Sequence, residues 1–139
     1  MTPNAALARR WFQEVWNDRK DATVRELMAE VCDGHMEGGE VRSPADFLAA
    51  RAALLAAFPD ISVKVEDVIS EGDKVVVRWS ATGTHRGGEL GIPASGKKAT
   101  FRGMSWIRFA NGKIVEGWDS WNMGRLLQEL EARPAAALR

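Results

Sequence analysis

Residues 98–122 read KATFRGMSWIRFANGKIVEGWDSWN, and this stretch decides the fold. It predicts two strands joined at Asn111-Gly112, because both residues of this pair tolerate the positive φ angles of a type I′ hairpin turn. Side chains alternate between the two faces of a strand, so the odd-numbered residues 115–121 are expected to share one face. Asp119 would then lie on the same face as Trp121 at the mouth of a sheet, where a carboxylate could serve as an acid or base.

The same period of two extends towards the N-terminus. Residues 61–69 alternate in polarity and predict a strand that ends at a Glu71-Gly72-Asp73 turn, and residues 74–85 predict a longer strand. Residues 87–96 contain glycine and proline and predict a loop. The chain beyond residue 60 is therefore expected to form the sheet.

The first 60 residues and the last part of the chain have helical spacing instead. Apolar residues recur at intervals of three and four in a helix that begins after Thr2-Pro3 and runs to about Asn17, in a second over 24–31, and in a third from Ser43-Pro44 to Phe58. Residues 32–41 predict a loop or irregular strand, residues 123–130 a final helix, and residues 133–137 a frayed tail. Helices first and strands later predict an α+β fold with an antiparallel sheet and helices packed on one face.

Composition limits the possible functions. A chain of 139 residues is expected to form one domain, residues 1–139, and its 19 basic and 19 acidic residues give no footprint for nucleic acid or an anionic membrane. No apolar run approaches the ~20 residues of a spanning helix, and the first residues lack a signal-peptide pattern. The single cysteine, Cys32, excludes an internal disulfide and fits a cytoplasmic location.

Strand parity brings several candidate site residues together. If Asp119 points inward, the odd face of strand 74–85 would deliver Trp79 and His85 to the same apolar chamber, where burial would raise the pKa of Asp119. His85 could then act as a proton shuttle. A simpler interpretation remains open for each residue: Asp119, Ser120 or Asn122 could cap the last helix, and His85 could be a surface loop residue.

Other chemistries find little support in the sequence. The two histidines have no HxH or HxxxH spacing, so no metal site is predicted. No Gly-x-Ser-x-Gly elbow occurs, and the glycines near His85 lack the spacing of a dinucleotide-binding fingerprint. We therefore predict a protein that uses no cofactor.

Four segments of the chain resemble the SnoaL-like polyketide cyclases of the nuclear-transport-factor-like superfamily. They are Gly83-Thr-His-Arg-Gly87, Gly91-Ile-Pro-Ala-Ser-Gly-Lys97, Gly112-Lys-Ile-Val-Glu-Gly-Trp-Asp119 and Leu126-Leu-Gln-Glu-Leu130. The resemblance covers nearly the whole chain. It implies a curved antiparallel sheet with N-terminal helices, which together form a cone around an apolar cavity, and a homodimer through the sheet.

The resemblance also implies roles for single residues. The aspartate that serves as acid/base for aldol ring closure in such cyclases falls on Asp119, and the family's loop histidine falls on His85. Ser105 stands where aromatic polyketide cyclases carry a cavity histidine, and Asn122 stands where many members have a second aspartate. These two departures separate this chain from the characterised polyketide cyclases.

We therefore predict an acid/base enzyme, an aldol-type cyclase, lyase or isomerase, that acts on a small hydrophobic carbonyl or polyketide-like compound. Asp119 and His85 are the predicted catalytic residues. The predicted substrate contacts are His35, Trp79, Phe101, Ser105, Trp121 and Asn122. The alternative is a non-catalytic module of the same fold that binds a hydrophobic ligand or forms a dimer. Neither hypothesis requires a metal, a nucleic acid or a membrane.

Overall fold

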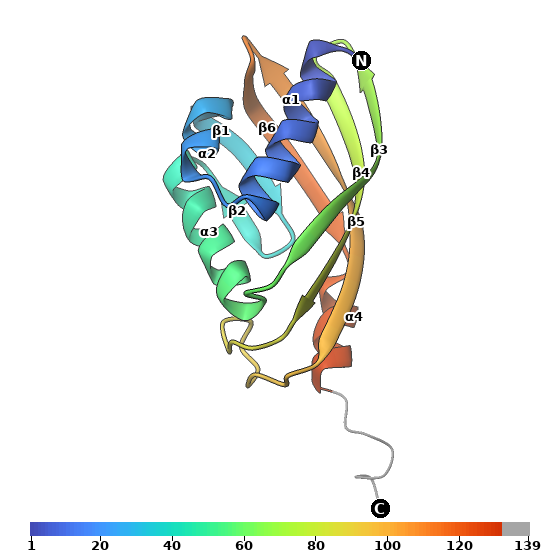
Figure 1. The fold of residues 1–139 in the computed structure, drawn as a ribbon. Helices are drawn as coiled ribbons and strands as arrows, with labels where there is room; N and C mark the ends of the chain where they lie inside the picture. Colours follow the sequence, from blue (N-terminus) through green and yellow to red (C-terminus); the bar gives the residue numbers. More distant parts are fainter. Residues whose placement is uncertain (132–139) are drawn as a thin grey trace, which may run out of the picture.

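The computed structural model describes residues 1–131, so the predicted tail at 133–137 lies outside the described residues. Its helices and strands, in chain order, are α1 (Pro3–Trp11), a π-helical segment η1 (Phe12–Asn17), α2 (Asp21–Leu27), β1 (Met28–Met36), β2 (Gly39–Val41), α3 (Pro44–Ala57), β3 (Ser62–Glu71), β4 (Lys74–Thr84), β5 (Lys98–Ala110), β6 (Lys113–Trp121) and α4 (Met123–Glu131). Figure 1 shows α1, α2 and α3 gathered on one side of a curved sheet, with α4 at its lower end.

The sheet has six strands in the order β2-β1-β6-β5-β4-β3, and it stays open because β2 and β3 form its two edges. The predicted α+β fold with N-terminal helices is confirmed. The expectation of a wholly antiparallel sheet is wrong at one place, since β1 pairs with β6 in parallel. Within residues 1–131 no helix has the length and apolar character needed to cross a membrane.

The β5–β6 hairpin forms where the sequence predicts it. Asn111 and Gly112 have φ angles of 52° and 75°, the two positive values that a type I′ turn requires. The register shifts between Arg108 and Phe109, which pair with Glu116 and Ile114 and leave Val115 as the extra residue of a β-bulge. Val115 therefore does not share the predicted face, whereas Gly117, Asp119 and Trp121 do.

The helix predicted over residues 24–31 is shorter than expected. Helix α2 ends at Leu27, and Met28 already pairs with Ile114 of β6. Val31, whose spacing suggested a buried helical position, is 86% exposed in an irregular part of β1. Backbone pairing with β6 thus overrides the local helical pattern, and the predicted loop or irregular strand at 32–41 becomes the β1–β2 hairpin.

The first and third helices begin at the predicted caps. Thr2 Oγ1 accepts a hydrogen bond from the Ala5 N–H at 3.1 Å, and Ser43 Oγ accepts one from the Asp46 N–H at 3.2 Å. The first helical stretch continues to Asn17 as predicted, but its last six residues form the wider π-helical turn of η1. This segment buries Trp16 against Phe47 of α3.

Candidate functional site

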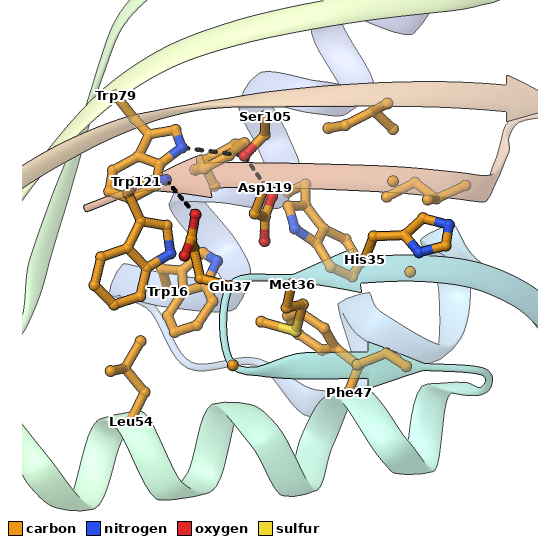
Figure 2. A pocket seen from close by; sticks show the side chains of 18 of the residues that line it. Trp16, His35, Met36, Glu37, Phe47, Leu54, Trp79, Ser105, Asp119 and Trp121 are labelled. Atoms are coloured by element: carbon orange, nitrogen blue, oxygen red, sulfur yellow. Dashed lines mark hydrogen bonds between the residues drawn. The ribbon is translucent and has the colours of Figure 1, made fainter. Parts of the chain in front are cut away.

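The concave face of the sheet encloses a cavity of about 120 Å³ with α1, η1, α3 and the β1–β2 hairpin. Its wall is mainly aromatic and includes Trp11, Trp16, Phe47, Trp79, Phe101 and Trp121 (Figure 2). A dry engineered cavity of about 150 Å³ binds benzene. The cavity is therefore suited to a compound with a single ring, or to one ring of a larger molecule.

Asp119 of β6 lies in this cavity, as strand parity predicts. Ser105, its register partner on β5, donates a hydrogen bond from Oγ to Asp119 Oδ1 at 2.6 Å. Trp79 Nε1 donates in turn to Ser105 Oγ at 3.1 Å. The chain of two hydrogen bonds holds one carboxylate oxygen in place and leaves the other oxygen available to a ligand.

The surroundings of Asp119 favour its protonated form. Burial in the apolar cavity raises the pKa of the carboxyl group, the hydrogen bond from Ser105 opposes this effect, and the negative charge of Glu37 adds to it. The residue as a whole keeps some exposure to solvent. Such an environment suits a carboxylate that takes up and returns a proton.

The capping interpretation of Asp119 is wrong, because another residue caps α4. Asn122 Oδ1 accepts a hydrogen bond from the Arg125 N–H at 2.9 Å. Asn122 is also absent from the residues that line the cavity, so a substrate contact at this position has no support in this geometry. Asn122, the residue between β6 and α4, thus caps the helix, and the side chain of Asp119 lines the cavity.

His85 lies apart from Asp119. It is fully buried, and its Nδ1 accepts a hydrogen bond from the Ser95 N–H at 3.1 Å. Its Nε2 has no hydrogen-bond partner among residues 1–131, and its ring packs near Phe58 with the centroids 5.7 Å apart. His85 does not line the cavity. The prediction that His85 lies in the same chamber as Asp119 is therefore wrong: the side chain secures the loop after β4 and does not line the cavity.

His35 borders the cavity, but its ring is engaged elsewhere. The imidazole stacks on Trp118 with the centroids 3.8 Å apart, and Nδ1 lies 2.6 Å from Glu40 Oε2. Trp118 stands on the face of β6 opposite to Asp119, because the two residues are neighbours in one strand. The imidazole therefore faces away from the carboxylate, and a substrate contact through its ring nitrogens has no support in this geometry.

The other four predicted contacts do come together at the cavity. Trp79, Phe101, Ser105 and Trp121 all line it. The Phe101 ring packs edge-on against Trp79, with centroids 6.2 Å apart, and lies at 5.1 Å and 30° to Trp121. These rings form a continuous wall beside Asp119, and their contact with a substrate stays a prediction.

Glu37 is a residue that sequence reasoning missed. It follows β1 in the hairpin turn and lines the cavity. Its Oε1 accepts a hydrogen bond from the backbone N–H of Trp121 at 3.2 Å. Figure 2 shows its carboxylate pointing towards the part of the cavity that holds Asp119. Nothing in the local pattern of residues 32–41 reveals this role, because only the parallel pairing of β1 with β6 brings the turn there.

The comparisons with known proteins agree with this geometry. The family model of the SnoaL-like polyketide cyclases matches residues 6–130. A comparison with curated proteins gives no match. Among solved structures, a candidate SnoaL-like polyketide cyclase from Jannaschia sp. CCS1 is 28% identical, with a TM-score of 0.88 over 95% of this chain and 94% of that one.

Two structures from Streptomyces are also similar. AclR from Streptomyces galilaeus, a candidate hydroxylase, is 30% identical, with a TM-score of 0.79 over 97% of this chain and 87% of that one. IdmH from Streptomyces antibioticus, a candidate polyketide cyclase, is 27% identical, with a TM-score of 0.81 over 93% and 99%. The predicted nuclear-transport-factor-like fold is confirmed, and the family and its neighbours support a cyclase-type role. This chain belongs to the SnoaL-like polyketide cyclase family.

Proposed function

We propose that this protein is a cofactor-independent acid/base enzyme that acts on a small hydrophobic carbonyl or polyketide-like compound. The observation that carries the proposal is the position of Asp119, whose carboxyl group lies in an aromatic cavity and is held by Ser105. A base of this kind must gain its proton from a bound ligand within hydrogen-bonding reach. The free oxygen of Asp119 satisfies this requirement for a ligand in the cavity.

The proposed reaction begins with the transfer of a proton from the carbon next to a carbonyl group to Asp119. The resulting enolate would be stabilised by indole N–H groups at the cavity, for which Trp16 and Trp121 are the candidates. In an aldol-type ring closure the enolate carbon forms a bond to a second carbonyl carbon of the same molecule, and Asp119 returns its proton to the new alkoxide. Return of the proton to a different carbon would instead give an isomerase, and cleavage of a bond next to the enolate would give a lyase.

The pKa of Asp119 gives a direct test. Because burial favours the protonated carboxyl, we expect Asp119 to titrate above the ordinary value of about 3.9 in a ¹³C NMR titration of its side-chain carboxyl. Ser105→Ala should raise this pKa further, because it removes the hydrogen bond that favours the ionised form. Asp119 titrating at or below its ordinary value in the wild type would contradict the role of a working base.

Protein stability should show the same effect with a defined sign. A carboxyl whose pKa is raised by folding contributes stability that is fully present below its unfolded pKa, about 3.9, and that is lost as the pH rises through the folded pKa. The free energy of unfolding of the wild type should therefore fall relative to that of Asp119→Asn over this pH range. Urea unfolding at a series of pH values measures the difference.

The alternative function is a binding module that holds a hydrophobic ligand without reacting with it. The aromatic wall of the cavity is compatible with this function as well. A raised pKa of Asp119 favours the enzyme, whereas an ordinary pKa combined with ligand binding favours the module. The cytoplasmic location expected from the sequence stays a prediction in either case.

We also propose that two copies associate through the face of the sheet opposite to the cavity. Met104 and Trp118 lie on this face and are 53% and 50% exposed. Large apolar side chains exposed together are typical of interaction surfaces. Sedimentation should show a dimer that Met104→Glu converts to a monomer, whereas Val31→Ser, at an exposed apolar residue of β1, should leave it unchanged. A monomeric wild type would contradict the proposal.

A further inference from the structure

The charged groups around the cavity are of one sign. Three carboxylates, those of Asp33, Glu37 and Asp119, belong to residues that line it, and the lining residues that the structure describes include no lysine or arginine. Asp33 Oδ1 forms an ion pair at 2.5 Å with Nη1 of Arg42, a residue that does not line the cavity. Two carboxylates, Glu37 and Asp119, therefore face the cavity without a basic partner.

The backbone holds Glu37 in this arrangement. Its Oε1 accepts the hydrogen bond from the backbone N–H of Trp121, and its Oε2 has no hydrogen bond to the protein among residues 1–131. A carboxylate anchored by one oxygen beside a second carboxylate repels any further anion that enters the cavity. The same arrangement attracts a cation, which would lie against Glu37 where this exposed residue borders the cavity.

The aromatic wall favours a cation for an independent reason. Trp16, Trp79 and Trp121 line the same cavity as Glu37 and Asp119 (Figure 2). Tryptophan faces attract ammonium groups through the negative face of the ring, and this attraction is stronger where water is excluded. An aromatic wall with the exposed carboxylate of Glu37 at its border offers both contacts that a hydrophobic ammonium compound uses.

We propose that the ligand of this cavity is a compact hydrophobic compound that carries a protonated amine, and that Glu37 selects for its positive charge. As a statement about substrate, this inference rests on the proposed function: the carbonyl compound on which Asp119 acts would carry the ammonium group near its reacting carbon. As a statement about binding, it stands on the cavity alone. The cavity volume of about 120 Å³ limits the compound to a single ring with a short side chain.

Three probes of nearly equal size and different charge test the proposal: benzylammonium, benzyl alcohol and benzoate. Binding at neutral pH is followed by the shifts of the indole N–H signals of Trp16 and Trp121 in NMR spectra, because both residues line this cavity. We expect benzylammonium to bind about tenfold more tightly than benzyl alcohol, which corresponds to one charge-assisted contact, and benzoate to bind about tenfold more weakly.

Two variants with the same change in net charge identify the selecting residue. Glu37→Gln should abolish most of the preference for benzylammonium over benzyl alcohol. Glu30→Gln changes an exposed glutamate of β1 outside the cavity and should preserve the preference. A preference that survives in Glu37→Gln, or that is lost equally in both variants, would overturn the role of Glu37.

The outcomes also separate this inference from the proposed function. If benzyl alcohol binds as tightly as benzylammonium to the wild type, or if none of the three probes shifts the indole signals, the selection for an amine is wrong. The raised pKa of Asp119 and its role as a base would be unaffected by either result, because the NMR titration measures them without a ligand.

Discussion

Asp119→Asn should lower turnover by about 10²–10⁴-fold, the usual contribution of a general acid or base, while the protein remains folded. Asparagine keeps the shape of the side chain and can still accept the hydrogen bond that Ser105 donates at 2.6 Å in the wild type. It cannot take up a proton from a carbon acid. The loss should therefore appear in kcat, with little change in the affinity for ligands that carry no charge.

Exchange of carbon-bound hydrogen gives a measurement that needs no knowledge of the natural substrate. Acetophenone has one ring and a carbonyl group with an acidic neighbouring methyl, so its uptake of deuterium from D₂O reports proton removal at a base in the cavity. The control is Asp67→Asn, which removes an exposed carboxylate of β3 outside the cavity and should exchange at the wild-type rate. An Asp119→Asn protein that exchanges as fast as the wild type would eliminate Asp119 as the base, and a wild type without exchange would favour the binding module.

Gly103→Ala should cost about 3 kcal/mol of stability, at the upper end of the range for overpacked cores. A Cβ at Gly103 would lie 2.5 Å from the Ser120 carbonyl oxygen, 2.7 Å from Trp79 Cζ2 and 2.8 Å from Trp121 Cβ. The first of these atoms belongs to the backbone of β6, so rotation of a side chain does not relieve the contact. The two strands must separate, and both tryptophans of the cavity wall must move.

Gly117→Ala is the matched control for this prediction. Gly117 also lines the cavity, on the strand that pairs with β5, but a Cβ there meets no atom within 4 Å. We expect its free energy of unfolding to change by no more than about 0.5 kcal/mol. Thermal or urea unfolding of the two variants measures the difference, and equal stabilities would mean that the close approach at Gly103 is not required. The Gly103→Ala protein should also bind benzyl alcohol more weakly, because its aromatic wall is displaced.

Local chemistry was sufficient to predict most of the elements. Asn111-Gly112 predicts a hairpin because the tight turn requires two positive φ angles, which few other residue pairs tolerate. Thr2 and Ser43 begin helices because their hydroxyl groups accept a hydrogen bond from a free backbone N–H. The inward direction of Asp119 follows from its short distance in sequence to Trp121 along a regular strand. These predictions hold because each depends on atoms only a few residues apart.

Predictions that reached across the sheet were less accurate. The spacing of Val31 with Leu27 suits a helix, yet the parallel pairing of β1 with β6 extends this segment and exposes Val31. Parity also placed His85 on the inner side of the strand predicted over 74–85. Its ring is buried, but it lies just after β4 and packs near Phe58, outside the cavity. A strand pattern defines the face on which a side chain lies and leaves its position along the sheet undefined.

The sequence by itself determined the α+β fold, the closing hairpin and the carboxylate on its inner face, because alternation, turn chemistry and capping all act over a few residues. Only the tertiary structure decided which groups meet that carboxylate. Strand register brings Ser105 to Asp119 and Trp79 to Ser105. A parallel pairing between strands about 80 residues apart in the chain brings Glu37 to the same cavity. Such pairings depend on the packing of the whole domain, so no local pattern encodes them.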